Sequence, residues 1–113
     1  MKTYKVVITS YAKGQMQEIK DYIKDELVNP DAARNLLTEM REHIKKLAYV
    51  ADSIKRIEEE PWGSHGVRKT IVKNFYVYFW IDVENIVVYI IAVTYAKRNQ
   101  KKVLERIKDM EYC

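Results

Sequence analysis

The spacing of apolar residues changes along the chain, from helical in the first half to strand-like in the second. Residues 3–9 are rich in β-branched and aromatic side chains, which predicts a first strand. Apolar residues then recur at helical spacing from Ala12 to Leu27. This pattern predicts an amphipathic helix over about 11–28, with Ser10 as its N-cap.

A second apolar stripe runs from Ala33 to Leu47 and predicts a longer helix. The pair Asn29-Pro30 ends the first helix and begins the second, because asparagine can cap a helix and proline suits its first position. Since the connection is so short, we expect the two helices to form an antiparallel hairpin.

The second half of the chain predicts three consecutive strands, at 67–73, 75–82 and 86–95. Val83-Glu84-Asn85 predicts a tight turn between the last two, and Lys73-Asn74 predicts either a turn or a bulge. The strand at 86–95 is apolar on both faces. It is therefore expected at the centre of the sheet, covered on one side by the helical hairpin.

Residues 58–66 hold two of the three glycines and are expected to form the main loop. Residues 99–111 predict a short final helix, whose apolar face consists of Val103, Leu104, Ile107 and Met110. The order β-α-α-β-β-β-(α) predicts an α+β fold in which one antiparallel-rich sheet packs against an N-terminal helical hairpin. At 113 residues, we expect a single domain over 1–113.

Charge is distributed unevenly between the two parts of the chain. Residues 1–66 carry 11 basic and 11 acidic side chains, whereas residues 67–113 carry 9 basic and 5 acidic ones. The whole excess of four positive charges therefore lies in the C-terminal part. This asymmetry favours a polyanionic or acidic partner for one face of the molecule.

Several classes of site are excluded by composition. Cys113 is the only cysteine, so the chain can form neither an internal disulfide nor a cysteine-based zinc site. Glu58-Glu59-Glu60 has no partner carboxylate or histidine at ligand spacing, so we expect a solvated helix end and no metal. No phosphate loop or dinucleotide fingerprint is present, and we expect no cofactor. No apolar run is long enough for a signal peptide or a membrane span, so we expect a cytoplasmic protein with no membrane partner.

Five local motifs occur in an order and spacing that cover almost the whole chain. They are Y-K-V-V-I-T-S-Y-A at 4–12, N-P-D-A-A at 29–33, G-V-R-K at 66–69, N-F-Y-V-Y-F-W-I-D at 74–82 and A-K-R-N at 96–99. Together they resemble the RelE/ParE superfamily of toxins from bacterial type II toxin–antitoxin modules. The resemblance implies a cognate antitoxin that holds the chain inactive.

Members of this superfamily differ in target. RelE-like toxins enter the ribosomal A site and cleave mRNA with Lys, Arg and often a Tyr, His or Glu near the C-terminus. ParE-like toxins poison DNA gyrase and carry no such catalytic set. RNA cleavage by the 2′-OH needs a base, an acid and cations that stabilise the charge on the phosphate.

By resemblance, Arg68 and Arg98 match basic residues of the RelE-like enzymes, Lys73 and Lys97 lie close to them in sequence, and Tyr95 is a nearby phenol. Arg68, Arg98, Lys73 and Tyr95 are therefore the candidate catalytic residues. The alternative for the two arginines is an exposed charge at a strand end, or an ion pair with Asp82 or Glu84. The alternative for Tyr95 and for Tyr78, the other nearby phenol, is packing within the strands.

The chain also departs from the RelE-like pattern. Leu104 stands where RelE has its C-terminal tyrosine, and Val77 stands where it has a strand arginine. The position expected for a second basic residue beside Arg68 falls near Thr70. His65 has a pKa suited to proton transfer but lies in the loop, and His43 is expected on the surface. Trp62 could stack on a base or cover the seam between helices and sheet, whereas Trp80 is expected to pack within its strand.

A cluster of cations follows the last predicted strand. The candidate nucleic-acid-binding residues are Lys69, Lys97, Lys101, Lys102 and Arg106. Contact with phosphate, docking of an acidic antitoxin segment and plain solubility are all open for this cluster.

The leading hypothesis is a toxin that inhibits translation as a ribosome-dependent mRNA endonuclease, with the ribosome and mRNA as partners. The first alternative is a ParE-like inhibitor of DNA gyrase without catalytic activity. The second is a family member that binds its antitoxin or DNA and inhibits nothing.

Overall fold

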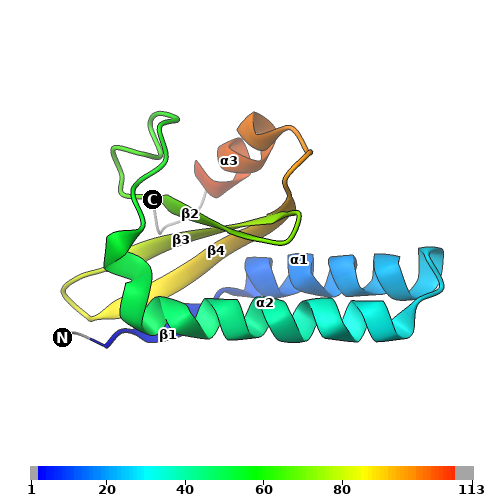
Figure 1. Cartoon of the computed structure of the whole chain (residues 1–113). Coiled ribbons are helices and arrows are strands. Elements are labelled where there is room, and N and C mark those ends of the chain that lie inside the picture. Colours follow the sequence, from blue (N-terminus) through cyan, green and yellow to red (C-terminus); the bar gives the residue numbers. More distant parts are fainter. Residues whose placement is uncertain (1–2, 109–113) are drawn as a thin grey trace.

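The computed structural model describes residues 3–108 (Figure 1). In chain order its elements are β1 (Lys5–Ile8), α1 (Ser10–Asp21), a π-helical turn (Tyr22–Glu26), α2 (Pro30–Val50), a 3-10 turn (Ala51–Ser53), β2 (Arg68–Val72), β3 (Phe75–Asp82), β4 (Val87–Tyr95) and α3 (Gln100–Lys108). Every predicted helix and strand is present. The α+β fold expected from the sequence is confirmed, and Met110, expected on the last helix, lies outside the described residues.

The four strands form one mixed sheet in the order β1-β4-β3-β2. β1 runs parallel to β4, while the β4–β3 and β3–β2 pairs are antiparallel. β4 is therefore a central strand, as its two apolar faces predict. No helix within residues 3–108 has the length and apolar character needed to cross a membrane.

The helical hairpin begins one residue earlier than predicted. Thr9, not Ser10, is the N-cap of α1, because its backbone is extended and its hydroxyl accepts a hydrogen bond from the amide of Ala12. The same hydroxyl donates to the carbonyl of Ile90 at 2.9 Å, which ties the start of α1 to the central strand. Asn29 caps α2 through its side chain and Pro30 is the first helical residue, as predicted.

The first helix also ends differently from the expected stop at residue 28. Its α-helical part ends at Asp21, and the chain continues as a π-helical turn. The amide of Asn29 donates to the carbonyl of Ile23, and Val28 between them has a φ of 48°. At this helix end a valine occupies the left-handed position that glycine usually fills.

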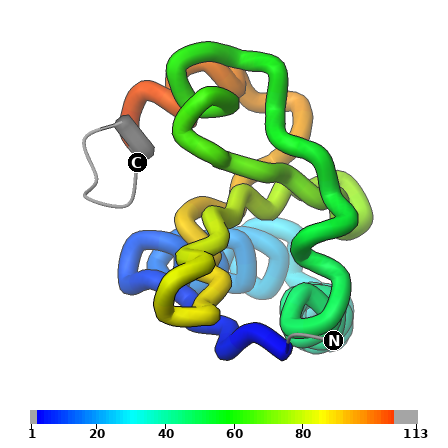
Figure 2. Tube along the Cα trace, turned by 90° about the vertical axis from the view of Figure 1, so that its left-hand side faces the viewer, coloured from blue at the N-terminus to red at the C-terminus, as the bar shows by residue number. Residues whose placement is uncertain are grey.

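Two apolar cores lie on opposite faces of the sheet (Figures 1 and 2). The first core joins α1 and α2 to the sheet and contains Met40, Ile44, Phe79 and Ile90. The second lies under α3 and the loop at 54–67; its members include Ile57, Trp62, Val67, Tyr78, Ile91 and Leu104. The predicted helical hairpin thus covers one face, and α3 and the loop add a cover to the other.

A β-bulge in β4 changes which residues face the hairpin. Tyr78 pairs with Ala92 and Phe79 pairs with Ile90, so Ile91 is the extra residue. Before the bulge Ile90 faces the hairpin, and after it Val93 does. The amide of Val93 donates to Oε1 of Gln15 on α1 at 2.6 Å. Lys73-Asn74, expected to be a turn or a bulge, forms a turn in which Lys73 has a φ of 54°.

Candidate functional site

Two hollows lie at opposite ends of the sheet. The first, which we call the arginine pocket, has a volume of about 150 Å³ and is lined by Asp52, Arg56, Ser64, His65, Gly66, Arg68, Trp80, Ile81 and Val83. The second, which we call the hairpin groove, has a volume of about 600 Å³ and is lined by Gln15, Glu18, Ile19, Tyr22, Ile23, Leu27, Asn74, Phe75, Val93, Thr94, Tyr95 and Arg98. On β3, Trp80 and Phe75 are five residues apart, or roughly 17 Å.

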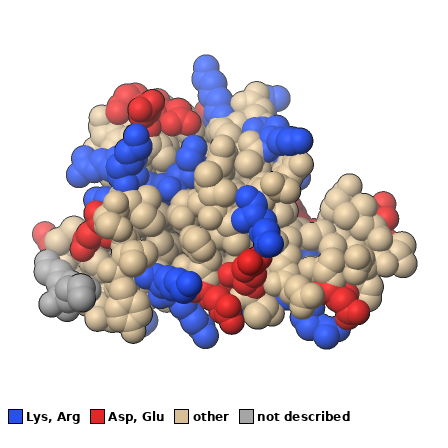
Figure 3. Space-filling view, viewed as in Figure 1, with Lys and Arg blue, Asp and Glu red and all other residues tan. Residues whose placement is uncertain are grey.

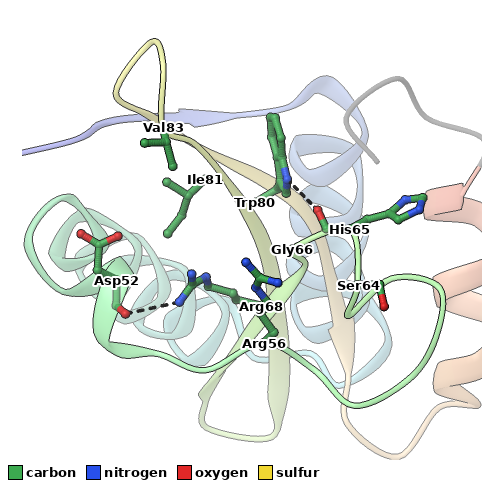
Figure 4. A pocket seen from close by; sticks show the side chains of 9 residues that line it. All are labelled: Asp52, Arg56, Ser64, His65, Gly66, Arg68, Trp80, Ile81 and Val83. Carbon is green, nitrogen blue, oxygen red and sulfur yellow. Dashed lines mark hydrogen bonds between the residues drawn. The ribbon is translucent and has the colours of Figure 1, made fainter.

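Arg68 lies in the arginine pocket and ties β2 to the segment that follows α2. Its Nη1 donates to the carbonyls of Ile54 and Asp52. The backbones of Arg56 and Arg68 form an antiparallel β-bridge. Its Nε is buried and has no hydrogen-bond partner among the described residues. In Figure 4 the guanidinium groups of Arg56 and Arg68 lie between Asp52 and Trp80.

The loop on the far side of this pocket is held by Trp80. The indole Nε1 donates to the carbonyl of His65 at 3.0 Å, and the ring stacks on Tyr89 with centroids 6.3 Å apart. Gly66 follows with a φ of +94°, and a Cβ there would lie 3.3 Å from the indole nitrogen. The imidazole of His65 points away from the pocket (Figure 4).

The other candidate catalytic residues lie at the opposite end of the sheet. Because the bulge at Ile91 shifts the alternation of β4, Tyr95 faces the hairpin, where its ring lies 5.7 Å from that of Phe75. Arg98 lines the same groove. Lys73 forms an ion pair with Glu39 of α2, with Nζ and Oε2 3.6 Å apart.

The structure therefore does not bring the four candidate catalytic residues together. Arg68 pairs with Phe79 and Tyr95 pairs with Phe75, four residues along the same strand. That offset corresponds to roughly 13 Å. The ion-pair alternative for the two arginines is wrong, because among the described residues neither forms an ion pair with Asp82 or Glu84. Arg98 is exposed after the end of β4, as the other alternative expects.

The carboxylate of Asp82 has another partner. It accepts hydrogen bonds from the side-chain and backbone N–H groups of Asn85, which hold the pKa of Asp82 below its usual value. The predicted turn at 83–85 is thus closed by hydrogen bonds between Asp82 and Asn85, and not by an arginine paired with Asp82.

The positions at which the chain departs from RelE-like enzymes are structural. Leu104 and Val77 are fully buried in the second and first cores, respectively. Thr70 shares a hydrogen bond of 3.1 Å with Nε2 of His43. The expectation that His43 lies on the surface is wrong, because it is half-buried and joins α2 to β2.

Burial bears on two further expectations, those for Trp62 and Tyr78. Trp62 is buried in the second core, which agrees with a covering role and leaves no face for stacking on a base. Burial raises the pKa of Tyr78, whose phenol donates to Oε1 of Gln100 at 2.8 Å. Tyr78 is fully buried in the second core and packs there, as its alternative reading expects. Glu58-Glu59-Glu60 lies in the loop, so the expected helix end is wrong there.

The candidate nucleic-acid-binding residues lie in two different settings. Lys97, Lys101, Lys102 and Arg106 are exposed, at and after the end of β4. Nζ of Lys69 instead lies over the ring of Tyr76, 4.1 Å from its centroid. On the face in Figure 3, Lys and Arg are scattered and Asp and Glu lie among them. Within residues 3–108, no three His, Cys, Asp or Glu side chains are grouped to hold a metal.

Sequence reasoning missed several residues that shape these hollows. Asp52 and Arg56 lie in a stretch without strong periodicity and reach the arginine pocket only because the chain returns there from α2. Gln100 donates to the carbonyls of Tyr95, Ala96 and Arg98 and thereby holds the turn before α3. Its only sequence signal is its place at the start of the predicted last helix.

One family model matches most of the chain. The profile of the family described as "ParE toxin of type II toxin-antitoxin system, parDE" matches residues 6–100. Among curated proteins, none gives a significant match to this chain.

Three solved structures share the fold. A chain from the chromosomal ParDE toxin–antitoxin system of P. aeruginosa is 21% identical, with a TM-score of 0.71 over 84% of this chain and 98% of that one. A chain of the RelBE2 toxin–antitoxin complex from Mycobacterium tuberculosis is 17% identical, with a TM-score of 0.57 over 82% and 98%. A mutant of the E. coli toxin RelE in the free state is 12% identical, with a TM-score of 0.57 over 93% and 98%.

Proposed function

The chain belongs to the ParE toxin family of type II toxin–antitoxin systems, and from this premise we propose that it is a binding toxin that inhibits DNA gyrase. The observation that carries the proposal is the separation of Arg68 from Tyr95 and Arg98. An RNase needs its acid, base and cations around one phosphate. Here Arg68 lies in one hollow and Tyr95 and Arg98 lie in the other, and the strand partners of Arg68 and Tyr95 are about 13 Å apart along β3.

The buried side chains at two positions also favour a gyrase inhibitor over an RNase. Leu104 and Val77, which stand where RelE has a tyrosine and an arginine, are fully buried and apolar. Tyr95 faces the helical hairpin and packs against Phe75. These residues favour the gyrase alternative over the leading hypothesis of an mRNA endonuclease, in which a phenol and an arginine would meet the scissile phosphate.

A supercoiling assay with purified gyrase and the purified chain tests this proposal. We expect supercoiling to be inhibited and cleaved DNA to accumulate. The companion measurement is primer extension on a translated message, where we expect no new 5′ ends. Cleavage that depends on translating ribosomes, is lost in Arg98→Ala, and occurs while supercoiling stays intact would contradict the proposal.

We also propose that the hairpin groove is where a cognate antitoxin neutralises the chain. The groove is largely apolar, and several large side chains on it are exposed: Tyr22 at 57%, Leu27 at 58% and Tyr95 at 38%. An exposed apolar groove of this kind is typical of a site that receives the apolar face of a partner segment. Arg98 at its rim suits an acidic residue on that segment.

The test of the groove is a pair of matched variants. Tyr22→Ser removes an aromatic ring from the groove, and Tyr49→Ser removes one that is 67% exposed on α2 outside it. We expect Tyr22→Ser to weaken binding of the antitoxin by about tenfold or more and Tyr49→Ser to change it little. Equal effects of the two variants would exclude the groove as the docking site.

A further inference from the structure

The arginine pocket carries two cationic side chains that form no ion pair among residues 3–108. Arg56 and Arg68 both line it, and neither forms an ion pair with an acidic side chain within the described residues. The Nε–H of Arg68 is a buried donor without a partner there. The guanidinium groups that line the pocket can therefore pair with an anionic group supplied by a partner.

The one carboxylate that lines the pocket is already engaged. Both oxygens of Asp52 accept from the phenol of Tyr4, at 2.8 and 3.0 Å. Asp52 contacts Arg68 through its backbone carbonyl instead. Two guanidinium groups and one carboxylate leave a net charge of about +1 in the pocket, which matches a single monoanionic group.

The volume and the lining residues of the pocket further restrict which kind of ligand can bind there. Its volume of about 150 Å³ is below the range of roughly 300–1,000 Å³ that holds a whole small molecule. It therefore suits one group presented by a larger partner. Ile81 and Val83 form an apolar side next to the arginines, and Val83 is 59% exposed. An apolar wall beside a cation suits a peptide carboxylate next to an apolar side chain better than it suits a sugar–phosphate chain, which is polar throughout.

We infer that the arginine pocket binds the carboxylate of an acidic peptide segment from a protein partner, with a neighbouring apolar side chain of that segment against Val83. The inference does not depend on whether gyrase is the target. The pocket and the hairpin groove are about 17 Å apart along β3, so a single carboxylate bound in the pocket leaves the groove open.

The experiment is an NMR titration of the intact chain at low ionic strength, which follows the indole N–H of Trp80 and the amide of Gly66. The probe is N-acetyl-leucyl-glutamate amide. Its neutral control is the glutamine analogue, and dimethyl phosphate represents a phosphodiester. The two tryptophan signals are assigned with Trp80→Phe.

We expect the glutamate peptide to shift both signals saturably, and the glutamine peptide to bind at least about tenfold more weakly. Arg56→Gln should weaken the glutamate peptide by a similar factor, while Lys55→Gln, an adjacent exposed cation that does not line the pocket, should leave its affinity unchanged. Arg56 is exposed, so its replacement leaves both cores intact.

Three results would overturn the inference. One is equal binding of the glutamate and glutamine peptides to the unmodified chain, which needs no variant to fold. Another is tighter binding of dimethyl phosphate than of the glutamate peptide, which would assign the pocket to nucleic acid. The third is equal loss of binding in Arg56→Gln and Lys55→Gln, which would indicate attraction by net charge alone.

Discussion

The phenol of Tyr4 donates to the carboxylate of Asp52, 48 residues away in the sequence, at 2.8 Å to Oδ1 and 3.0 Å to Oδ2. Tyr4 is 5% exposed and precedes β1, while Asp52 lies in the 3-10 turn after α2. The bond therefore fastens the first strand to the far end of the helical hairpin. It also keeps the carboxylate of Asp52 occupied beside the two arginines of the pocket.

Removal of this phenol is expected to destabilise the fold. Tyr4→Phe deletes one hydrogen bond to a charged acceptor and should lower the free energy of unfolding by about 1 kcal/mol. Urea denaturation measures the change. Tyr49→Phe, which alters an exposed tyrosine, is the matched control and should stay within about 0.5 kcal/mol of the unmodified chain. A loss of the same size in both variants would show that the hydrogen bond from Tyr4 to Asp52 does not specifically stabilise the fold.

The same hydrogen bond predicts a dependence on alkaline pH. The hydrogen bond to Asp52, burial and the charge of Asp52 together raise the pKa of Tyr4 above its ordinary value of 10.0, and the charge of Arg68 opposes them. Because the folded state holds the proton more tightly than the unfolded state, the stabilisation is complete below pH 10 and is lost as pH rises through the raised pKa. The difference in stability between the unmodified chain and Tyr4→Phe should therefore shrink above pH 10. A stability difference between the two proteins that grows above pH 10 would contradict the predicted direction of this pH dependence.

Val28 predicts a substitution that stabilises the fold. Its φ of 48° is unfavourable for a β-branched side chain, and the residue is 80% exposed, so it makes little compensating contact. Asparagine tolerates this conformation, so Val28→Asn should raise the free energy of unfolding by about 1 kcal/mol. Thermal unfolding is the readout. Val83→Asn, also exposed but without a positive φ, should bring no such gain.

Gln100 predicts a defect at the start of α3. Its side chain accepts from Tyr78 and donates to three carbonyls, so Gln100→Ala leaves the phenol of Tyr78 and the turn at 95–98 without these partners. We expect a loss of about 2 kcal/mol and faster amide exchange in α3. Gln17→Ala removes an exposed glutamine that bonds Asp21 on α1, and should change neither measurement. Unchanged exchange in both variants would show that α3 is held by its apolar contacts alone.

Most elements of the fold could be predicted because their signals are local. Asn29 and Pro30 lie next to each other and suit a cap and a first helical position, so the hairpin was predicted with its turn. The apolar run in β4 predicted a central strand for the same reason. The cap of α1 was placed one residue late, because Thr9 and Ser10 are equally good caps and only the bond from Thr9 to Ile90 distinguishes them.

The candidate site was harder to predict, since it depends on register. From alternation alone, the side of the sheet on which Tyr95 lies is ambiguous, and the bulge at Ile91 decides it. Bulges arise where two strands meet, and no single strand carries their signal. His43 was placed on the surface for a similar reason, because its partner Thr70 is 27 residues away.

The sequence by itself determined the order of helices and strands, the central position of β4, the C-terminal excess of positive charge and the family resemblance. Each of these rests on neighbouring residues or on composition. Only the tertiary structure decided which charges share a hollow. It separated Arg68 from Arg98 and set Arg68 beside Arg56 instead. The physical reason is that pairing between strands, and the return of the chain after α2, set the distances between side chains that are far apart in the sequence.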